Sequence, residues 1–439
     1  MRMKPALMIS LVIMVYSLQA FAQTTAEIAD IWDKEHVSNM LPSNVRHKNL
    51  LKYLDGLKKL GLKVDEVGRS GQNREIFQIE WGKGPKKVFL WSQMHGDEPT
   101  ATSALIDMFT VLQKNRDKDW VKAIEKTLTI RAVPMLNPDG AEVYLRRNSQ
   151  GIDINRDAQN LVTPEAKILK ALRESWSPEI GFNLHNQQGL TTAGKTNKQA
   201  AISFLVVYGD AEKTLTPGLE RNRRIVVAMN QALSGFMPGS IARYGDDWTP
   251  SAFGDNFSAW GTPVILIETG GLYGKDEMFL VKMNFISFLT AVKLLADGGD
   301  TAFNPADYEL IPNNSSGCIL HFVFRNATII DRSKPADQLI ADLGLFTERR
   351  RAEMSAPTTI RQVGDLSMIS GLEEYDARDF NVTGRFTPLK TGALGELLFY
   401  KKGREVDWAS TDIEKEFPPD AIFSLGKWVK GEGVVKKRI

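Results

Sequence analysis

The sequence predicts an α/β protein: a mostly parallel, mixed sheet flanked by helices, followed by a smaller, mostly β C-terminal domain. Three features of the 439-residue chain indicate this fold. The candidate strands of the longer, N-terminal part are apolar throughout, as strands covered on both faces are. Helical stretches alternate with them, a pattern typical of parallel sheets. After Asp297 the composition changes to short strand-like pieces separated by turns.

The first helix is expected over Ser43–Leu60, where apolar residues recur at helical spacing. Ser43 is a suitable cap for its start, and Gly61 lies just past its end. Two strands separated by a Gly-Pro turn should follow, and the second of them is KKVFLW. The next helix should begin at Pro99, because the first turn of a helix tolerates proline.

Four further apolar runs predict strands, at 128–136, 179–185, 202–209 and 262–270. Helical stretches such as PEAKILKALRESW and DEMFLVKMNFISFLTAVKLLA separate or follow them. A segment rich in Gly, Asn, Pro and Ser then indicates a linker. We therefore expect a first domain over 23–297, and a linker with a β-rich accessory domain over 298–439.

Residues 1–22 have the features of a signal peptide. A basic start is followed by an apolar stretch and the small-x-small triplet Ala20-Phe21-Ala22. The stretch is shorter than the about 20 apolar residues of a membrane span, so we expect cleavage and no stable membrane anchor. Cys318 is the only cysteine, which excludes an internal disulfide. We expect an exported bacterial protein, periplasmic or secreted, that is stabilised by a large core.

The charge balance argues against a nucleic-acid partner. The chain has 55 lysines and arginines against 53 aspartates and glutamates, with no long run of one sign. A nucleic-acid-binding protein would carry a basic patch or stripe. We therefore expect no nucleic acid among its partners.

Two histidines at the ends of apolar strands are candidate metal ligands. His95 and Glu98 lie three positions apart where the strand VFLW ends and a helix begins, and His185 ends the strand of GFNLH. The carboxyl ends of parallel strands meet at one edge of a sheet, where α/β proteins place their sites. Two histidines and a carboxylate are typical ligands of catalytic zinc, which keeps a fourth position for water.

Each of these residues also has a purely structural interpretation. Glu98 can favour the start of a helix through the helix dipole, and His185 can be an ordinary core histidine. The other three histidines of the chain fall near the first helix or in the accessory domain. His95 and His185 are therefore the pair that the fold can bring together.

Charged residues elsewhere in the first domain fit a site for an anionic substrate. Arg146, Arg147 and Arg156 lie in a segment that follows the turn Asn-Pro-Asp-Gly. The planar fork of arginine matches a carboxylate, although a solvated surface charge is the usual role of arginine. Glu268 interrupts the otherwise apolar strand VILIETGG. A carboxylate is costly to bury in such a place unless it has a use.

Together these motifs resemble those of the carboxypeptidase A-type zinc metallocarboxypeptidases. HGDE, NPDG, RRNSQGIDINR, a strand-end LH and IETGG occur in the order and approximate spacing of that family, within residues 25–297. The resemblance implies that the first domain is a zinc carboxypeptidase-like catalytic domain. It also implies that His95, Glu98 and His185 hold one zinc ion.

The resemblance assigns roles to further residues. Glu268 would activate water as the general base, and Arg146 would stabilise the oxyanion. Asn155 and Arg156 would bind the terminal carboxylate of the substrate. Asp153 would orient the first zinc histidine, which fixes its tautomer and raises its basicity.

The motifs depart from the family pattern in two places. Asn-Gln-Gln follows His185, where the family usually has small or aromatic residues. The mobile tyrosine of the family has no clean match; Tyr244 is our choice and Tyr273 the alternative. Three acids of the same segment either favour a basic substrate group or form a hydrated acidic loop: Asp246, Asp247 and Asp255.

The implied function is hydrolysis of the C-terminal amide bond of peptides with a free carboxylate. The export signal makes cell-wall peptides a candidate substrate. One alternative is a zinc-dependent deacylase of N-acyl amino acids, because aspartoacylase-like proteins share a His-Gly-x-Glu motif; NPDG and GIDINRD favour the carboxypeptidase. Another is a carbohydrate- or peptidoglycan-binding protein that acts through its β domain, against which the complete set of zinc ligands argues.

Overall fold

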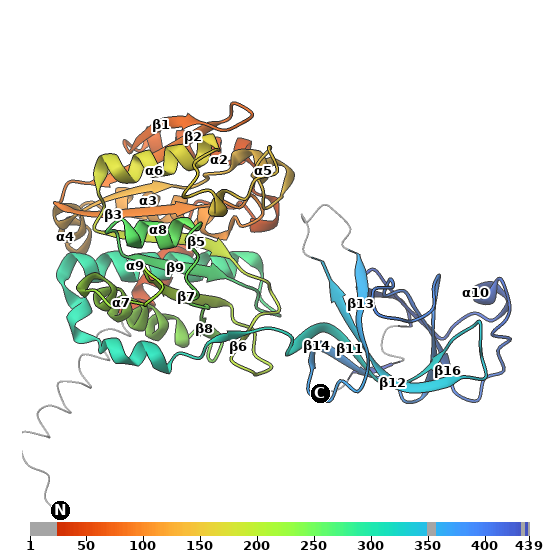
Figure 1. The fold of residues 1–439 in the computed structure, drawn as a ribbon. Helices are drawn as coiled ribbons and strands as arrows, with labels where there is room; N and C mark the ends of the chain where they lie inside the picture. The colour runs from red at the N-terminus through yellow and green to blue at the C-terminus, as the bar shows by residue number, and fades with distance from the viewer. Residues whose placement is uncertain (1–23, 349–356, 432–434, 438–439) are drawn as a thin grey trace, which may run out of the picture. The chain divides into compact units, whose positions relative to one another are not determined.

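A computed structural model describes residues 24–348, 357–431 and 435–437 of the chain (Figure 1). The expected signal peptide, 1–22, lies outside these residues. The chain divides into two compact units, an α/β unit that extends to Asn314 and a β unit that follows it. The segment Leu190–Lys198 groups with the second unit. The predicted fold class is confirmed: a mixed, mostly parallel sheet with helices, and a mostly antiparallel β region after it.

The first unit is built on an eight-stranded sheet in the order β1-β2-β4-β3-β5-β9-β7-β8. Its four central strands, β4, β3, β5 and β9, are mutually parallel, whereas β1, β2 and β7 join by antiparallel pairing. The strands are β1 (Lys63–Arg69), β2 (Glu75–Gly82), β3 (Lys86–Ser92), β4 (Leu128–Val133), β5 (Ile180–Asn186), β7 (Ile202–Val207), β8 (Ile241–Arg243) and β9 (Val264–Thr269).

Helices cover both faces of this sheet. The helices are α2 (His47–Lys59), α3 (Thr100–Lys114), α4 (Asp119–Thr127), α5 (Pro138–Val143), α6 (Pro164–Trp176), α7 (Pro217–Ser234), α8 (Phe253–Ala259) and α9 (Glu277–Asp297), and residues 24–35 are also helical. The larger core joins one face to α2, α3, α4, α7 and α9, and the smaller core joins the other face to α6 and α8. Both faces are therefore apolar, as the sequence predicts.

One helix of the described residues, α9, is long and apolar enough to cross a membrane. However, 78% of its most apolar window is buried within the unit. Phe285 and Phe288 on it are fully buried. Its hydrophobicity is thus explained by packing in the core.

The structure differs from the sequence prediction at several elements. The helix predicted from Ser43 begins at His47 with Arg46 at its N-cap, because Pro42–Asn44 forms a separate 3₁₀ turn that includes Ser43. The predicted Ser43 cap is therefore wrong, and the helix over 24–35 was not predicted. Strands β2 and β3 are consecutive in the chain but not neighbours, since β4 lies between them. The edge strands β1 and β8 were not predicted. β1 is largely exposed and carries charges, and β8 is only three residues long.

The second unit contains a nine-stranded sheet with its own apolar core. Most of its pairs are antiparallel, but β11 pairs in parallel with β14 and β15. Its strands are β11 (Ile319–Ile330), β12 (Gln338–Thr347), β13 (Thr358–Gly364), β14 (Ser370–Asp376), β15 (Phe380–Gly384), β16 (Leu397–Lys401), β17 (Ala421–Ser424), β18 (Lys427–Lys430) and β19 (Lys436–Lys437), with one short helix, α10 (Ile413–Glu416). Two short strands lie near the division of the chain, β6 (Thr192–Ala193) and β10 (Asn314–Ser315).

Candidate metal centre

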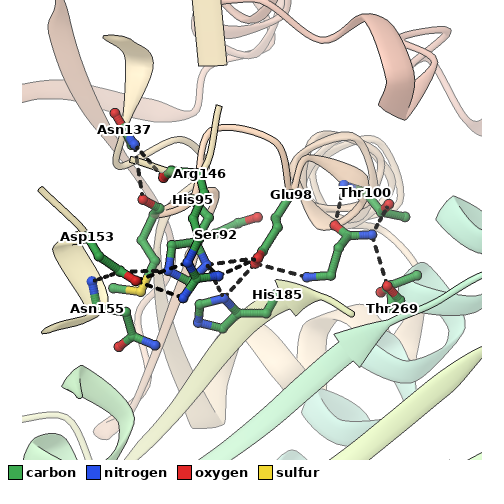
Figure 2. A network of polar contacts seen from close by, with 12 residues as sticks. Ser92, His95, Glu98, Thr100, Asn137, Arg146, Asp153, Asn155, His185 and Thr269 are labelled. Atoms are coloured by element: carbon green, nitrogen blue, oxygen red, sulfur yellow. Dashed lines mark hydrogen bonds and ion pairs between the residues drawn. The ribbon is translucent and has the colours of Figure 1, made fainter. Parts of the chain in front are cut away.

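Three side chains from two distant parts of the chain meet at the carboxyl end of the central strands (Figure 2). Nδ1 of His95 lies 2.9 Å from Glu98 Oε1, and Nδ1 of His185 lies 2.7 Å from Glu98 Oε2. The two Nδ1 atoms are 3.1 Å apart. All three side chains are buried. The structure thus brings together the residues that the sequence nominates as metal ligands, and we call them the triad.

The sheet and one tight loop set this arrangement. β3 and β5 are parallel neighbours, with Ser92 opposite Leu184, so the chain leaves β3 beside the end of β5. The loop after β3 then passes close to α5: a Cβ on Gly96 would lie 2.0 Å from the carbonyl carbon of Gly140. Only glycine fits this close approach. Gly96 therefore lets the loop place His95 and Glu98 over the end of the sheet.

Asp153 fixes the orientation of His95. Its Oδ1 lies 3.0 Å from Nε2 of His95 and also accepts a hydrogen bond from the main-chain N–H of Asn155. A carboxylate at Nε2 favours the tautomer protonated there, which leaves the Nδ1 lone pair directed at the triad. Burial raises the pKa of Asp153, but His95 and Arg146 outweigh it and hold that pKa well below its usual range. Asp153 is therefore ionised.

Arg146 lies against the triad from the solvent side, with 42% of its side chain exposed. Its Nε donates to Asp153 Oδ2 at 3.0 Å, and one terminal nitrogen lies 3.2 Å from Glu98 Oε1. The same nitrogen lies 3.1 Å from Nδ1 of His95. A guanidinium thus faces the point where the ligand atoms converge.

Asn137, the first residue of NPDG, joins two loops of the site, a role that the sequence does not predict. Its side-chain nitrogen donates to the carbonyl oxygens of Met94 and Arg146, at 3.2 and 3.3 Å, and its Oδ1 accepts from Gly140 (Figure 2). It thereby ties the loop of His95 to the loop of Arg146. The motif predicts a turn, and nothing in its spacing indicates that the asparagine also joins a second loop.

The charges of the three triad residues shift one another's pKa values. Burial raises the pKa of Glu98, but His95 and His185 outweigh this effect and hold that pKa well below its usual range. Burial lowers the pKa of His95, yet Glu98 and Asp153 raise it to about 9. His185 lacks a partner like Asp153, and burial lowers its pKa. The two histidines differ because only one of them has a second carboxylate.

Glu268 lies beside the triad on β9. It is opposite His185 in the parallel register of β5 and β9, and its side chain is buried. Burial, and then the negative charge of Glu98, raise the pKa of Glu268 well above its usual range. A buried carboxyl group that takes up a proton readily beside a metal site is suited to general base and acid chemistry.

The donor set fits a single zinc ion. Two imidazole nitrogens and a carboxylate oxygen are the usual protein ligands of a catalytic zinc site. Ligands about 2.0–2.2 Å from one tetrahedral ion lie roughly 3.3 Å apart. Here the two Nδ1 atoms lie 3.1 Å apart and each lies 2.7–2.9 Å from a different oxygen of Glu98, and one ligand atom from each residue can be chosen within 4.8 Å of the others.

The remaining predicted residues lie around the triad without touching it. Asn155 and Arg156 belong to the 3₁₀ turn that follows Asp153. Oδ1 of Asn155 accepts from the main-chain N–H of Phe253, and Arg156, which is exposed, donates to the carbonyl of Asn155. The negative charge of Glu268, and then burial, raise the pKa of Tyr244 to about 12.

Replacing Asp153 by alanine tests its role in orienting His95. We expect the affinity for zinc to fall roughly 10- to 100-fold, because the ring of His95 loses its orienting acceptor. Competition with a chromophoric chelator measures this affinity. An unchanged affinity would show that Asp153 does not orient the ligand.

The chain is similar to known carboxypeptidases. Residues 48–201 match the family model of zinc carboxypeptidases, Peptidase M14. Probable carboxypeptidase 2 of Arthroderma benhamiae is 28% identical over 110 residues, which cover 25% of this chain and 20% of that protein. Carboxypeptidase SOL1 of Arabidopsis thaliana is 30% identical over 133 residues and 26% of either chain. The chain thus spans about a quarter or less of the length of these relatives.

Among solved structures, a metallo-carboxypeptidase of Burkholderia cenocepacia has 17% identity and a TM-score of 0.47, and the match covers 57% of this chain and 69% of that one. The segment that matches the family model contains the whole triad, together with Arg146 and Asp153. The similarity to zinc carboxypeptidases therefore covers the segment that carries the triad.

Proposed function

We propose that the protein is a zinc-dependent carboxypeptidase that hydrolyses the C-terminal amide bond of peptides. One observation carries the proposal: the side chains of His95, Glu98 and His185 converge, with the two Nδ1 atoms 3.1 Å apart and each within 2.9 Å of an oxygen of Glu98. Beside them lie a buried carboxyl group, Glu268, and a guanidinium, Arg146. The family match of residues 48–201 supports the same conclusion.

In the proposed reaction, the metal ion, Glu268 and Arg146 would each have a separate role. A bound zinc ion would supply Lewis acidity and lower the pKa of water toward about 7. Glu268 would take a proton from that water and pass it to the leaving amine, since its raised pKa favours proton uptake. Arg146 would stabilise the negative charge that develops on the scissile carbonyl oxygen.

The substrate would be held by its terminal carboxylate. Arg156 is exposed in the turn that follows Asp153, and it is the arginine we assign to this carboxylate. Asn155 would act beside it, and Tyr244, the residue after β8, would close over the substrate. Arg156 would contribute mainly by placing the scissile bond, which converts binding energy into orientation.

Removal of the metal tests the proposal. Treating the purified protein with o-phenanthroline should abolish release of C-terminal residues from short peptides, and added zinc should restore it, because zinc chemistry requires the ion. The released amino acids can be quantified by mass spectrometry. Activity that persists after complete metal removal would contradict the proposal.

The same assay separates the carboxypeptidase from the deacylase. A dipeptide with a blocked amino terminus should be cleaved faster than an N-acetyl amino acid, because a peptidase also binds the residue on the acyl side of the scissile bond, which the N-acetyl amino acid lacks. Faster turnover of the N-acetyl amino acid would assign the chain to the deacylases instead.

A further inference from the structure

The geometry points to Asn186 as a positioning residue that locks the three elements carrying the metal ligands and the general base. This inference rests on the proposed zinc site. Asn186 follows His185 directly, at the point where the sequence departs from the family pattern. Its polar side chain is buried, although it is not one of the three proposed metal ligands.

Every hydrogen-bonding group of the Asn186 amide is used. Its Oδ1 accepts from the main-chain N–H of Thr100 at 3.2 Å. Its Nδ2 donates to Thr100 Oγ1 at 2.7 Å and to the carbonyl oxygen of Thr269 at 3.1 Å. One side chain on β5 therefore joins the start of α3 to the end of β9.

These partners are next to the residues of the site. Thr100 lies two residues after Glu98, and Thr269 directly follows Glu268. The main-chain N–H of Asn186 also donates to Glu98 Oε2 at 3.1 Å. A displacement of any one of the three elements would consequently move either a ligand or the base relative to the others.

The N-cap residue of α3 does not provide a side-chain hydrogen bond at the start of the helix. Pro99 occupies the N-cap of the helix and provides no side-chain hydrogen bond to it. The first N–H groups of a helix lack partners within the helix, and Asn186 supplies one from the neighbouring strand. It thus acts as a cap from outside, which fixes the helix that follows Glu98.

The second zinc histidine depends on this support more than the first. Nε2 of His95 is held by Asp153, whereas Nε2 of His185 is buried without a hydrogen-bond partner among the described residues. Within the part of the chain that the structure describes, Nε2 of His185 therefore has no counterpart to Asp153. Its position is set by the end of β5, which Asn186 anchors.

The replacement Asn186→Leu tests the inference, because leucine is of similar size but cannot make these bonds. We expect the zinc affinity of the metal-free protein to fall roughly 10- to 100-fold, as it does when groups that orient metal ligands are lost. The visible spectrum of the cobalt-substituted protein should also change, since the ligands of the ion would be rearranged. Both are read from the full chain without an activity assay.

Asn115→Leu is the matched control. Asn115 is a buried asparagine at the other end of α3, where its Nδ2 donates to Glu35 Oε2 and the carbonyl oxygen of Val111. Its loss should lower the melting temperature of the metal-free protein as Asn186→Leu does, but should leave zinc affinity and the cobalt spectrum unchanged. Equal zinc affinities in the two variants and the unmodified protein would overturn the inference.

A milder variant covers the case in which Asn186→Leu does not fold. Thr100→Val removes only the hydroxyl that accepts from Asn186, so we expect a smaller loss of zinc affinity in the same direction; an unchanged affinity and cobalt spectrum would overturn the inference. If zinc binding weakens in these variants but the unmodified, zinc-loaded protein cleaves no peptide, the proposed function alone is refuted. An unmodified protein that binds no zinc would refute both.

Discussion

Replacing Glu268 by glutamine is expected to lower kcat by about 10²- to 10⁴-fold, the usual contribution of a positioned general base and acid. Glutamine keeps the shape of the side chain but cannot take up the proton. Because Glu268 is not a ligand in the proposed site, the variant should retain its zinc. Steady-state kinetics on a short peptide, with metal content measured on the same sample, checks both statements.

Asp107→Asn is the control for this variant. Asp107 is also a buried carboxyl group whose pKa burial raises, to about 6, but it bonds to Trp32 and to the main chain at Val37 and Ser38. Its replacement should alter stability without a comparable loss of kcat. Full activity in Glu268→Gln would assign the proton transfer to another group.

Replacing His185 by alanine should remove metal binding at micromolar zinc and abolish peptide hydrolysis. The variant would leave only one imidazole and one carboxylate, fewer protein ligands than a catalytic zinc site has. Metal analysis after dialysis, together with the peptide assay, measures the effect. We expect the loss to exceed that in Asp153→Ala, since a ligand is removed rather than misoriented.

His47→Ala provides the matched comparison. His47 is a buried histidine of the same unit whose Nε2 lies 2.9 Å from the carbonyl oxygen of Glu75. Its replacement should cost stability but leave one zinc ion per chain. Zinc retained by His185→Ala as well would place the metal elsewhere.

The sequence could predict the centre of the fold because the central strands are covered on both faces. Their apolar runs are followed by His95 and His185, so the same segments predict both the ends of the strands and the candidate ligands. The edges were harder to predict. β1 alternates irregularly between buried and exposed positions, and β8 depends on tertiary pairing with β7 rather than on its own sequence.

The candidate site could be predicted to the extent that its chemistry is carried by unusual residues. A histidine at the end of an apolar strand, or a glutamate within one, is unusual there and so indicates a possible functional role. Asn137 and Asn186 could not be recognised in this way, because asparagine is common in turns and after strands. Their importance lies in bonds to main-chain atoms of distant segments, which a single sequence does not encode locally.

His321 illustrates the opposite outcome. It was set aside because it falls in the accessory domain, and the structure gives it an internal partner: its Nδ1 accepts from the main-chain N–H of Thr347. Burial lowers its pKa to about 4, so it is neutral at physiological pH. It is a half-buried histidine of the second unit with a main-chain partner.

The position of the metal tests the central claim most directly. Crystals grown with zinc should give one strong anomalous peak at the zinc absorption edge, about 2.0–2.2 Å from Nδ1 of His95, Nδ1 of His185 and a carboxylate oxygen of Glu98. Glu268 should face that peak without binding it. A peak bound by other residues, or no peak in metal-replete crystals, would contradict the site and the chemistry built on it.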